Sequence, residues 1–111
     1  MEYSSMQIAM QVQTGNMSLH QAGAALAAAL LERGHQISAV YFHDDGVQVV
    51  DPAFAHVWSS VAKSGALLLV CSTGLANRDI GAEQVTGVFC TAGLAQFFDQ
   101  VLAAHRCITI R

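Results

Sequence analysis

Residues 66–70 form an unbroken apolar run, Ala-Leu-Leu-Leu-Val, which ends abruptly in Cys71 and is followed by Ser72 and Thr73. A short apolar run after a Ser-Gly pair is typical of a strand buried on both faces of a parallel sheet. Ser72 and Thr73 are candidate N-caps for a helix that begins directly after the strand. The pattern therefore predicts that Cys71 lies at the carboxyl end of a central strand, beside a helix N-terminus.

Further segments along the chain alternate between strand-like and helix-like patterns. The predicted strands cover residues 6–13, 36–42, 66–71, 85–90 and 107–110. The predicted helices cover residues 18–33, 51–63 and a last segment through 102 that Thr91 caps, with a helical turn after Cys71 and a loop or strand extension over 43–50. Strands that alternate with helices imply a mainly parallel sheet with helices on both faces. We therefore expect residues 1–111 to form a single doubly wound, three-layer α/β domain with about five strands.

The first and last predicted helices carry apolar residues at helical spacing. Ser18 and Gln21 match a capping box at the start of the first helix. The apolar face of this helix is mostly small, which predicts close packing on the sheet, and it consists of Leu19, Ala22, Gly23, Leu26, Ala27 and Leu30. The face predicted for the last helix consists of Leu94, Phe97, Phe98, Val101 and Leu102.

Charged residues make up only 12% of the chain, about half of the roughly 25% that is typical of globular proteins. So few charges cannot cover the surface of a small monomer evenly, and we expect part of the surface to be buried against other subunits. The net charge is −3, and the five Lys and Arg residues are spread thinly. Without a basic patch, direct nucleic-acid binding is not expected.

No basic residue precedes the first apolar segment, so we expect no secretory signal. No apolar run approaches the roughly 18 residues of a membrane span. The three cysteines are odd in number and have neither a CxxC pair nor metal-ligand spacing, which favours free thiols over a disulfide framework. These features together predict a cytoplasmic protein with no membrane association.

Cys71 is the leading candidate for chemistry, although buried cysteines are also common core residues. A cysteine that carries sulfur as a persulfide needs a thiolate, an accessible sulfur and a field that stabilises negative charge. A strand-to-helix junction supplies such a field, and the small residues after Cys71 leave room for a sulfur donor. Arg78 lies seven residues on, so two helical turns would bring it over the same face, with a solvated or intersubunit role as the alternative.

The other two cysteines have less favourable positions. Cys90 ends another predicted strand and would line the same edge of the sheet, but the strand before it is irregular, so a structural role is favoured. Cys107 begins a strand at the opposite edge and is predicted to be a packing residue.

Two loops follow predicted strands on the same edge as Cys71. Residues 14–16, Thr-Gly-Asn, resemble the phosphate loops of flavodoxin-type folds in position, but no GxGxxG or GxxxxGK[ST] motif is present, so a simple turn and cap is favoured. His43 stands beside Asp44 and Asp45, a set that can tune a pKa or bind a metal, and a solvated loop is the favoured alternative.

The remaining histidines are scattered through predicted helices and loops, without an HExxH motif or paired ligand spacing: His20, His35, His56 and His105. We therefore predict no metal site and no cofactor. The serines lack a GxSxG elbow, so serine hydrolase chemistry has no support.

The order and spacing of these features resemble the DsrE/TusD group of small sulfur-relay proteins, over nearly the whole chain. The shared features are an apolar strand before Thr14-Gly15, a helix ending in Glu32-Arg33-Gly34-His35, the strand 38–42 with Gly46-Val47 after it, Leu69-Val70-Cys71 with Leu75 and Arg78, and Gly93-Leu94 before the last helix and strand. Two features depart from the group: the segment between Arg78 and the last helix is shorter than usual, and His43 stands where an aromatic residue is common.

The resemblance implies a DsrEFH-like α/β fold with flavodoxin-like topology, and a sulfurtransferase cysteine that accepts sulfane sulfur as a persulfide and passes it on. By position that cysteine is Cys71. Relatives form heterohexamers with homologous sister subunits, and some form homo-oligomers. They exchange sulfur with a TusA-like donor and a TusE/DsrC-like acceptor, in tRNA thiolation or in sulfur oxidation.

Two other functions stay open at this point. One is a binding module in which residues 14–18 and 43–45 hold a nucleotide or another small anion. The other is a non-catalytic assembly subunit, which the low charge and the small-residue helices also allow.

Overall fold

The computed structural model describes residues 5–111, in which strands and helices alternate along the chain. The strands are β1 (Gln7–Val12), β2 (Gln36–Phe42), β3 (Leu67–Cys71), β4 (Phe89–Ala92) and β5 (Arg106–Ile110). The helices are α1 (Met17–Glu32), α2 (Pro52–Val57), α3 (Ser59–Lys63), α4 (Ser72–Asn77) and α5 (Leu94–Ala103), with the 3₁₀ helices η1 (Asp44–Val50) and η2 (Ala82–Gln84).

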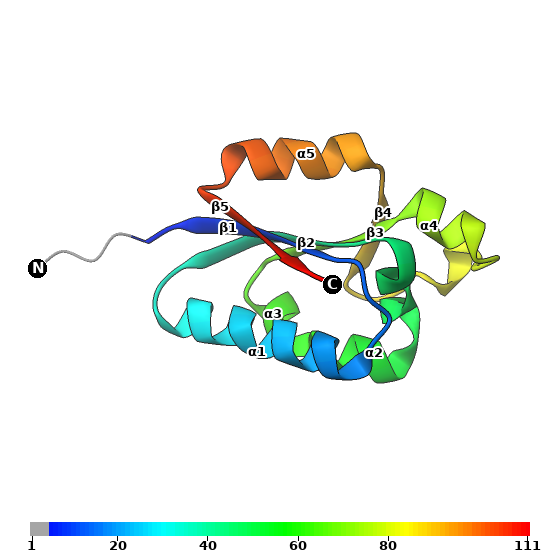
Figure 1. The fold of residues 1–111 in the computed structure, drawn as a ribbon, viewed down its shortest axis with the longest axis horizontal. Coiled ribbons are helices and arrows are strands. Elements are labelled where there is room, and N and C mark those ends of the chain that lie inside the picture. The colour runs from blue at the N-terminus through cyan, green and yellow to red at the C-terminus, as the bar shows by residue number, and fades with distance from the viewer. Residues whose placement is uncertain (1–4) are drawn as a thin grey trace, which may run out of the picture.

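All five strands pair in parallel, in the order β4-β3-β2-β1-β5. Helices α1, α2 and α3 cover one face of the sheet and α5 covers the other, while α4 lies at the carboxyl end of the strands (Figure 1). The prediction of a doubly wound, three-layer α/β fold is confirmed. The strand order differs from the flavodoxin order 2-1-3-4-5, because β5 and not β2 is the outer neighbour of β1.

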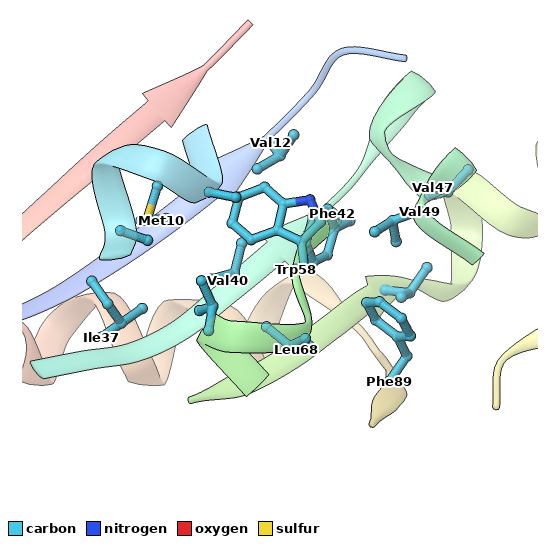
Figure 2. Close-up of a cluster of buried hydrophobic side chains, with 14 of the residues drawn as sticks. Met10, Val12, Ile37, Val40, Phe42, Val47, Val49, Trp58, Leu68 and Phe89 are labelled. Atoms are coloured by element: carbon cyan, nitrogen blue, oxygen red, sulfur yellow. The ribbon is translucent and has the colours of Figure 1, made fainter. Parts of the chain in front are cut away.

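The larger core lies between the sheet and helices α1 to α3, and Trp58 stands at its centre (Figure 2). Helix α1 packs closely here because three of its four buried residues are small, namely Gly23, Ala24 and Ala27: a Cβ added to Gly23 would lie 3.3 Å from the Trp58 ring. Close packing of α1 is therefore confirmed. Leu19 and Leu26 of the predicted apolar face are nevertheless exposed, because the buried stripe runs through His20 and Ala24 instead.

His20 is fully buried in this core and is held by two hydrogen bonds. Its Nδ1 accepts from the indole N–H of Trp58 at 3.0 Å, and its Nε2 lies 2.7 Å from the carbonyl oxygen of Thr14. An indole N–H is a donor only. His20 is therefore the neutral tautomer with its proton on Nε2, which donates to Thr14, and burial lowers the pKa of His20 below its ordinary value.

A smaller core lies on the opposite face, under α5. Its members are Ala9, Ala39, Tyr41, Leu69, Ala92 and Phe97. Of the face predicted for α5, only Phe97 is fully buried, while Leu94, Phe98 and Leu102 are 55%, 53% and 83% exposed. These three residues lie four positions apart and form one apolar stripe on the outside of α5, which we call the α5 stripe.

Several local predictions are corrected by the structure. Helix α1 is capped by Asn16, whose side chain accepts from Leu19 N, and not by Ser18. The residues after β2 coil into η1, which buries Val47 and Val49, where a loop or strand extension was predicted. The two-residue spacing of these valines is that of a strand, so the pattern did not indicate a 3₁₀ helix.

The last strand-helix unit also starts later than predicted. Gly87 has a φ of +66° and forms a turn, so β4 begins only at Phe89. Thr91 belongs to β4, and the N-cap of α5 is Gly93, whose N–H donates to the side chain of Gln96 at 2.8 Å. The helix predicted over residues 51–63 is divided at Trp58 into α2 and α3.

None of the helices within residues 5–111 is both long and apolar enough to cross a bilayer.

Candidate functional site

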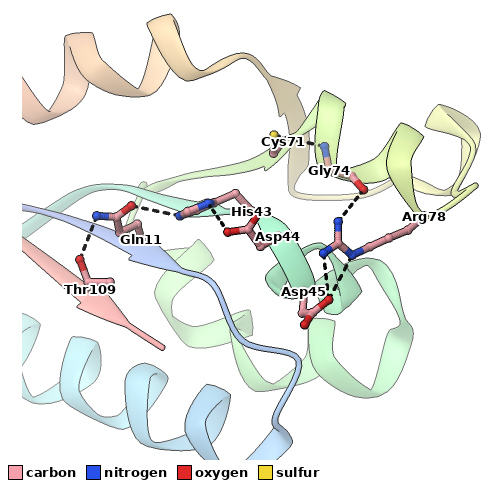
Figure 3. A network of polar contacts seen from close by, with 8 residues as sticks. All are labelled: Gln11, His43, Asp44, Asp45, Cys71, Gly74, Arg78 and Thr109. Carbon is pink, nitrogen blue, oxygen red and sulfur yellow. Dashed lines mark hydrogen bonds and ion pairs between the residues drawn. The ribbon is translucent and has the colours of Figure 1, made fainter.

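Cys71 is the last residue of β3 and the N-cap of α4, so the predicted strand-to-helix junction is confirmed. Ser72 and Thr73, which were predicted as caps, lie instead in the first turn of α4. The capping atom is the sulfur itself: Cys71 Sγ accepts the backbone N–H of Gly74 at 3.3 Å (Figure 3). A donor at this position stabilises negative charge on the sulfur.

Gly74 is required where α4 packs against η1. A Cβ at this position would lie 2.9 Å from Cγ1 of Val47 and 3.5 Å from the backbone N of Asp44. The small residue therefore lets the first turn of α4 approach η1 and aims its N–H at Cys71. Gly46 has a similar role on the other side of η1, because a Cβ there would overlap the carbonyl oxygen of Val12.

Cys71 is half-buried and lines a hollow of about 280 Å³ at the carboxyl end of β2 and β3. The ends of β2 and β3 and the beginnings of η1, α4 and α5 surround this hollow, which is lined by Tyr41, His43, Asp44, Cys71, Thr73, Gly74, Asn77 and Leu94. The sulfur is thus reachable from solvent, and it is not sealed in the core.

Tyr41 lies beside Cys71 on the α5 face of the sheet. Its ring is stacked between Phe97, at 4.7 Å, and His43, at 5.2 Å, and the side chain is only 1% exposed. Tyr41 and Cys71 line the same hollow. Burial, the interaction with Cys71 and the charge of Asp44 all raise the pKa of Tyr41 far above its ordinary value.

His43 connects the hollow to β1 and β5. Its Nε2 lies 3.0 Å from Gln11 Oε1, and the amide of Gln11 donates to Thr109 at 2.8 Å (Figure 3). Its Nδ1 lies 3.4 Å from a carboxylate oxygen of Asp44. Burial lowers the pKa of His43, and the charge of Asp44 and its hydrogen bond act in the opposite direction. Asp44 and Asp45 are exposed, as predicted for a solvated loop, while His43 is partly buried in the wall of the hollow.

Arg78 lies behind the first turn of α4 and does not line the hollow. Its Nε and Nη2 donate to Asp45 Oδ1 at 3.2 and 2.9 Å, and its Nη1 donates to the carbonyl oxygen of Gly74 at 3.2 Å (Figure 3). Arg78 thus joins α4 to η1 through the same residue whose N–H donates to Cys71. Of the positions left open for Arg78, the one over the face of the sulfur is not observed, and its hydrogen bond to the residues around the sulfur is the one to the carbonyl of Gly74.

Both other cysteines are exposed, which contradicts the packing role predicted for Cys107 and does not support the structural role favoured for Cys90. Cys90 faces the side of the sheet that α5 covers, but α5 lies over β1 and β2 and leaves β4 open. Cys107 lies on β5, an edge strand that pairs only with β1. Edge strands have one neighbour, so their side chains lack cover on one side.

Residues 14–16 form the turn and cap that were favoured for them. Asp45 lies against this turn, because a Cβ on Gly15 would be 3.3 Å from the carbonyl oxygen and 3.5 Å from the Cβ of Asp45. In the described part of the chain, no three His, Cys, Asp or Glu side chains are grouped so that they could hold a metal ion.

The model of the DsrE/DsrF-like family matches residues 6–110, nearly the whole chain. The chain belongs to the DsrE/DsrF-like family. This confirms the resemblance stated from the sequence, and membership associates the chain with sulfur relay. No curated protein matches the chain.

Sequence reasoning missed Tyr41 at this site, and it treated Gly74 only as one of the small residues that leave room for a sulfur donor. Tyr41 pairs with Leu69 across β2 and β3, so Cys71 lies two positions further along the same face of the neighbouring strand. That relation requires the strand register, which no pattern within β2 or β3 contains. The signal for Gly74 was present, as a glycine in the first turn of a helix is unfavourable without a packing reason.

Proposed function

We propose that this chain is a sulfur carrier, in which Cys71 holds sulfane sulfur as a persulfide and passes it to a partner protein. The observation that carries the proposal is the sulfur of Cys71, which lines an open hollow at the carboxyl end of β3 and accepts a backbone N–H from α4. Membership of the DsrE/DsrF-like family supports the same role.

The transfer requires no net oxidation. The Cys71 thiolate attacks the outer sulfur of a donor persulfide, R–S–SH, so that a new S–S bond forms and the donor leaves as R–S⁻. The product is Cys71–S–SH. In the second step an acceptor thiolate attacks the outer sulfur, takes it as R′–S–SH, and Cys71 leaves as a thiolate. Both steps need an approach to the sulfur, which the hollow provides.

Partners follow from the same proposal. A TusA-like donor and a TusE/DsrC-like acceptor would deliver and remove the sulfur, in tRNA thiolation or in sulfur oxidation. Sister subunits, in a homo-oligomer or a heterohexamer-like assembly, would cover apolar surface that the single chain exposes. The α5 stripe supports this part of the proposal, because its three large apolar side chains are each more than half exposed.

The alternative of an anion-binding module has less support. Asp45 lies against the turn over residues 14–16, where a phosphate would have to bind, and Asp44 stands at the neighbouring strand end. The carboxylate of Asp45 repels an anion at this turn, and it already pairs with Arg78 beside it. Residues 14–16 are engaged in the cap of α1, which is the structural role that the sequence favoured.

The proposal is tested by sulfur loading. Purified protein is incubated with an equimolar amount of inorganic polysulfide, and peptide mass mapping locates any gain of one sulfur atom, about 32 Da. We expect the gain on the Cys71 peptide of the wild type and of the variant Cys90→Ser/Cys107→Ser. Cys71→Ser is the matched control, since it keeps both exposed thiols. If Cys71→Ser takes up sulfur as fast as the wild type, Cys71 is not the carrier.

A further inference from the structure

We propose that the hydroxyl of Tyr41 is a second hydrogen-bond donor to the reacting sulfur, and that it stabilises the thiolate form of Cys71 together with the N–H of Gly74. This inference rests on the proposed function, since it assigns a residue to the same transfer step. It starts from the positions of the two residues in the fold: Tyr41 and Cys71 line one hollow, and Tyr41 pairs with Leu69, two positions before Cys71 on the neighbouring strand.

The hollow offers the sulfur no cationic partner. The eight described residues that line it include no lysine or arginine. Arg78, the nearest arginine in sequence, is engaged by Asp45 and by the carbonyl of Gly74. Burial holds His43 toward its neutral form, and Asp44 adds a negative charge to the wall of the hollow. A thiolate in this hollow must therefore be stabilised by neutral hydrogen-bond donors. Donors that already point at the sulfur stabilise it without first having to reorient.

Tyr41 meets that requirement because its ring is fixed on both sides. Phe97 and His43 stack on it with interplanar angles of 14° and 19°, and the side chain is almost completely buried. The strand register places this ring opposite Leu69, two positions before Cys71 on the same face of the sheet. A ring held in this way has little side-chain entropy left to lose when the hydroxyl donates to the sulfur.

The hydroxyl acts as a donor and not as a base. Burial, Cys71 and Asp44 all raise the pKa of Tyr41, so its proton stays in place throughout the neutral range. The donor serves both transfer steps. During loading it increases the thiolate fraction of Cys71, and during unloading Cys71 Sγ is the leaving group, whose negative charge the same bond stabilises.

The test compares Tyr41→Phe with the parent protein in the Cys90→Ser/Cys107→Ser background, where Cys71 is the only thiol. Tyr41→Phe removes the hydroxyl and keeps the stacked ring. Iodoacetamide alkylation is measured at pH 7 and at about pH 10, where an ordinary thiol is ionised. We expect the variant to react roughly tenfold more slowly at pH 7, the effect of losing one hydrogen bond to a charged group. At about pH 10 it should equal or exceed the parent, because a thiolate with fewer donors is the stronger nucleophile.

Equal rates at pH 7, or the same ratio at both pH values, would overturn the inference. Phe97→Leu is the packing control, since it loosens the stack and leaves the hydroxyl. We expect it to lower the ratio of the rates at pH 7 and about pH 10 less than Tyr41→Phe does, and an equal or larger reduction would contradict the role of the hydroxyl. Alkylation needs no sulfur donor. A wild type that takes up no sulfur would therefore end the proposed function, while the pH-dependent difference would still support the hydrogen bond.

A second measurement covers the case in which Tyr41→Phe fails to fold. Protein labelled with ¹³C at the tyrosine Cζ gives two signals, from Tyr3 and Tyr41, which Tyr3→Phe assigns. Titration of the wild type through the ionisation of Cys71 should move the Tyr41 signal, and Cys71→Ala should abolish that movement. A Tyr41 signal that does not respond to the ionisation of Cys71 contradicts the inference.

Discussion

Acidification should destabilise this protein through one buried histidine, His20. In the folded chain Nδ1 of His20 accepts from Trp58 and Nε2 donates to Thr14, so a second ring proton would point at the indole N–H. Burial lowers the pKa of His20 in the folded state below the ordinary value of 6.5. The unfolded chain therefore binds a proton more readily than the folded one, and the free energy of unfolding falls as the pH drops below about 6.5.

The expected loss of stability follows from the uptake of one proton by His20. Between the unfolded and the folded pKa, each pH unit removes up to about 1.4 kcal/mol of stability. From pH 7.5 to pH 5, His20 should account for a loss of up to about 2 kcal/mol, out of a total stability of roughly 5–15 kcal/mol for a domain of this size. His43, whose pKa burial also lowers, contributes in the same direction, so His20 must be isolated by a variant.

The assay is urea denaturation at a series of pH values between 7.5 and 5, followed by circular dichroism. The variant His20→Leu/Trp58→Phe removes the imidazole and the indole N–H together, so that no donor is left facing an empty acceptor site. We expect it to be less stable than the wild type at pH 7.5, and its free energy of unfolding to fall less on acidification, by up to about 2 kcal/mol.

Val61→Ala is the matched control, because Val61 is a fully buried residue of the same core without a polar group. It should lower the stability by a similar amount at every pH and keep the slope of the wild type. The reasoning is refuted if the double variant loses as much stability on acidification as the wild type and Val61→Ala do.

Two further predictions concern the site and the surface. Gly74→Ala puts a Cβ 2.9 Å from Val47 Cγ1, so we expect overpacking to lower the free energy of unfolding in urea by about 1–3 kcal/mol. Alkylation of Cys71 should also become slower, because the N–H of residue 74 moves away from the sulfur, and a rate equal to that of the wild type would contradict the role of this turn. Leu102→Asp places a charge on the α5 stripe, where Leu102 is 83% exposed. It should reduce the mass of the assembly in analytical ultracentrifugation and leave the fold intact, and a wild type that sediments as a monomer would remove the basis for this expectation.

The order of strands and helices could be predicted from the sequence because each element carries its own pattern. The apolar run before Cys71 is the strongest case, as a strand buried on both faces must be apolar at every position. Boundaries were less reliable where one pattern fits two structures. Val47 and Val49 alternate as in a strand, yet they point into the core from η1, which Gly46 allows to pass close to the end of β1.

The helix faces were predicted only in part, since burial depends on where the rest of the fold lies. Leu94, Phe98 and Leu102 are apolar at helical spacing, but α5 packs over β1 and β2 with Phe97 and leaves the stripe outside. The periodicity of one sequence does not distinguish a helix face that covers the chain's own sheet from a helix face that stays open to other chains.

By itself the sequence determined the fold class, the position of Cys71 at a strand end and the family, because these depend on local patterns and their order. Only the tertiary structure decided which side chains meet there. Tyr41 lies beside Cys71, and Gln11 donates to Thr109, because of the strand order and register. Trp58 donates to His20 because the junction of α2 and α3 packs against α1. The physical reason is that the periodicity of a segment specifies which face of the helix or strand each side chain lies on. The partner of that side chain depends on which strand or helix packs beside it, and the local pattern does not contain this information.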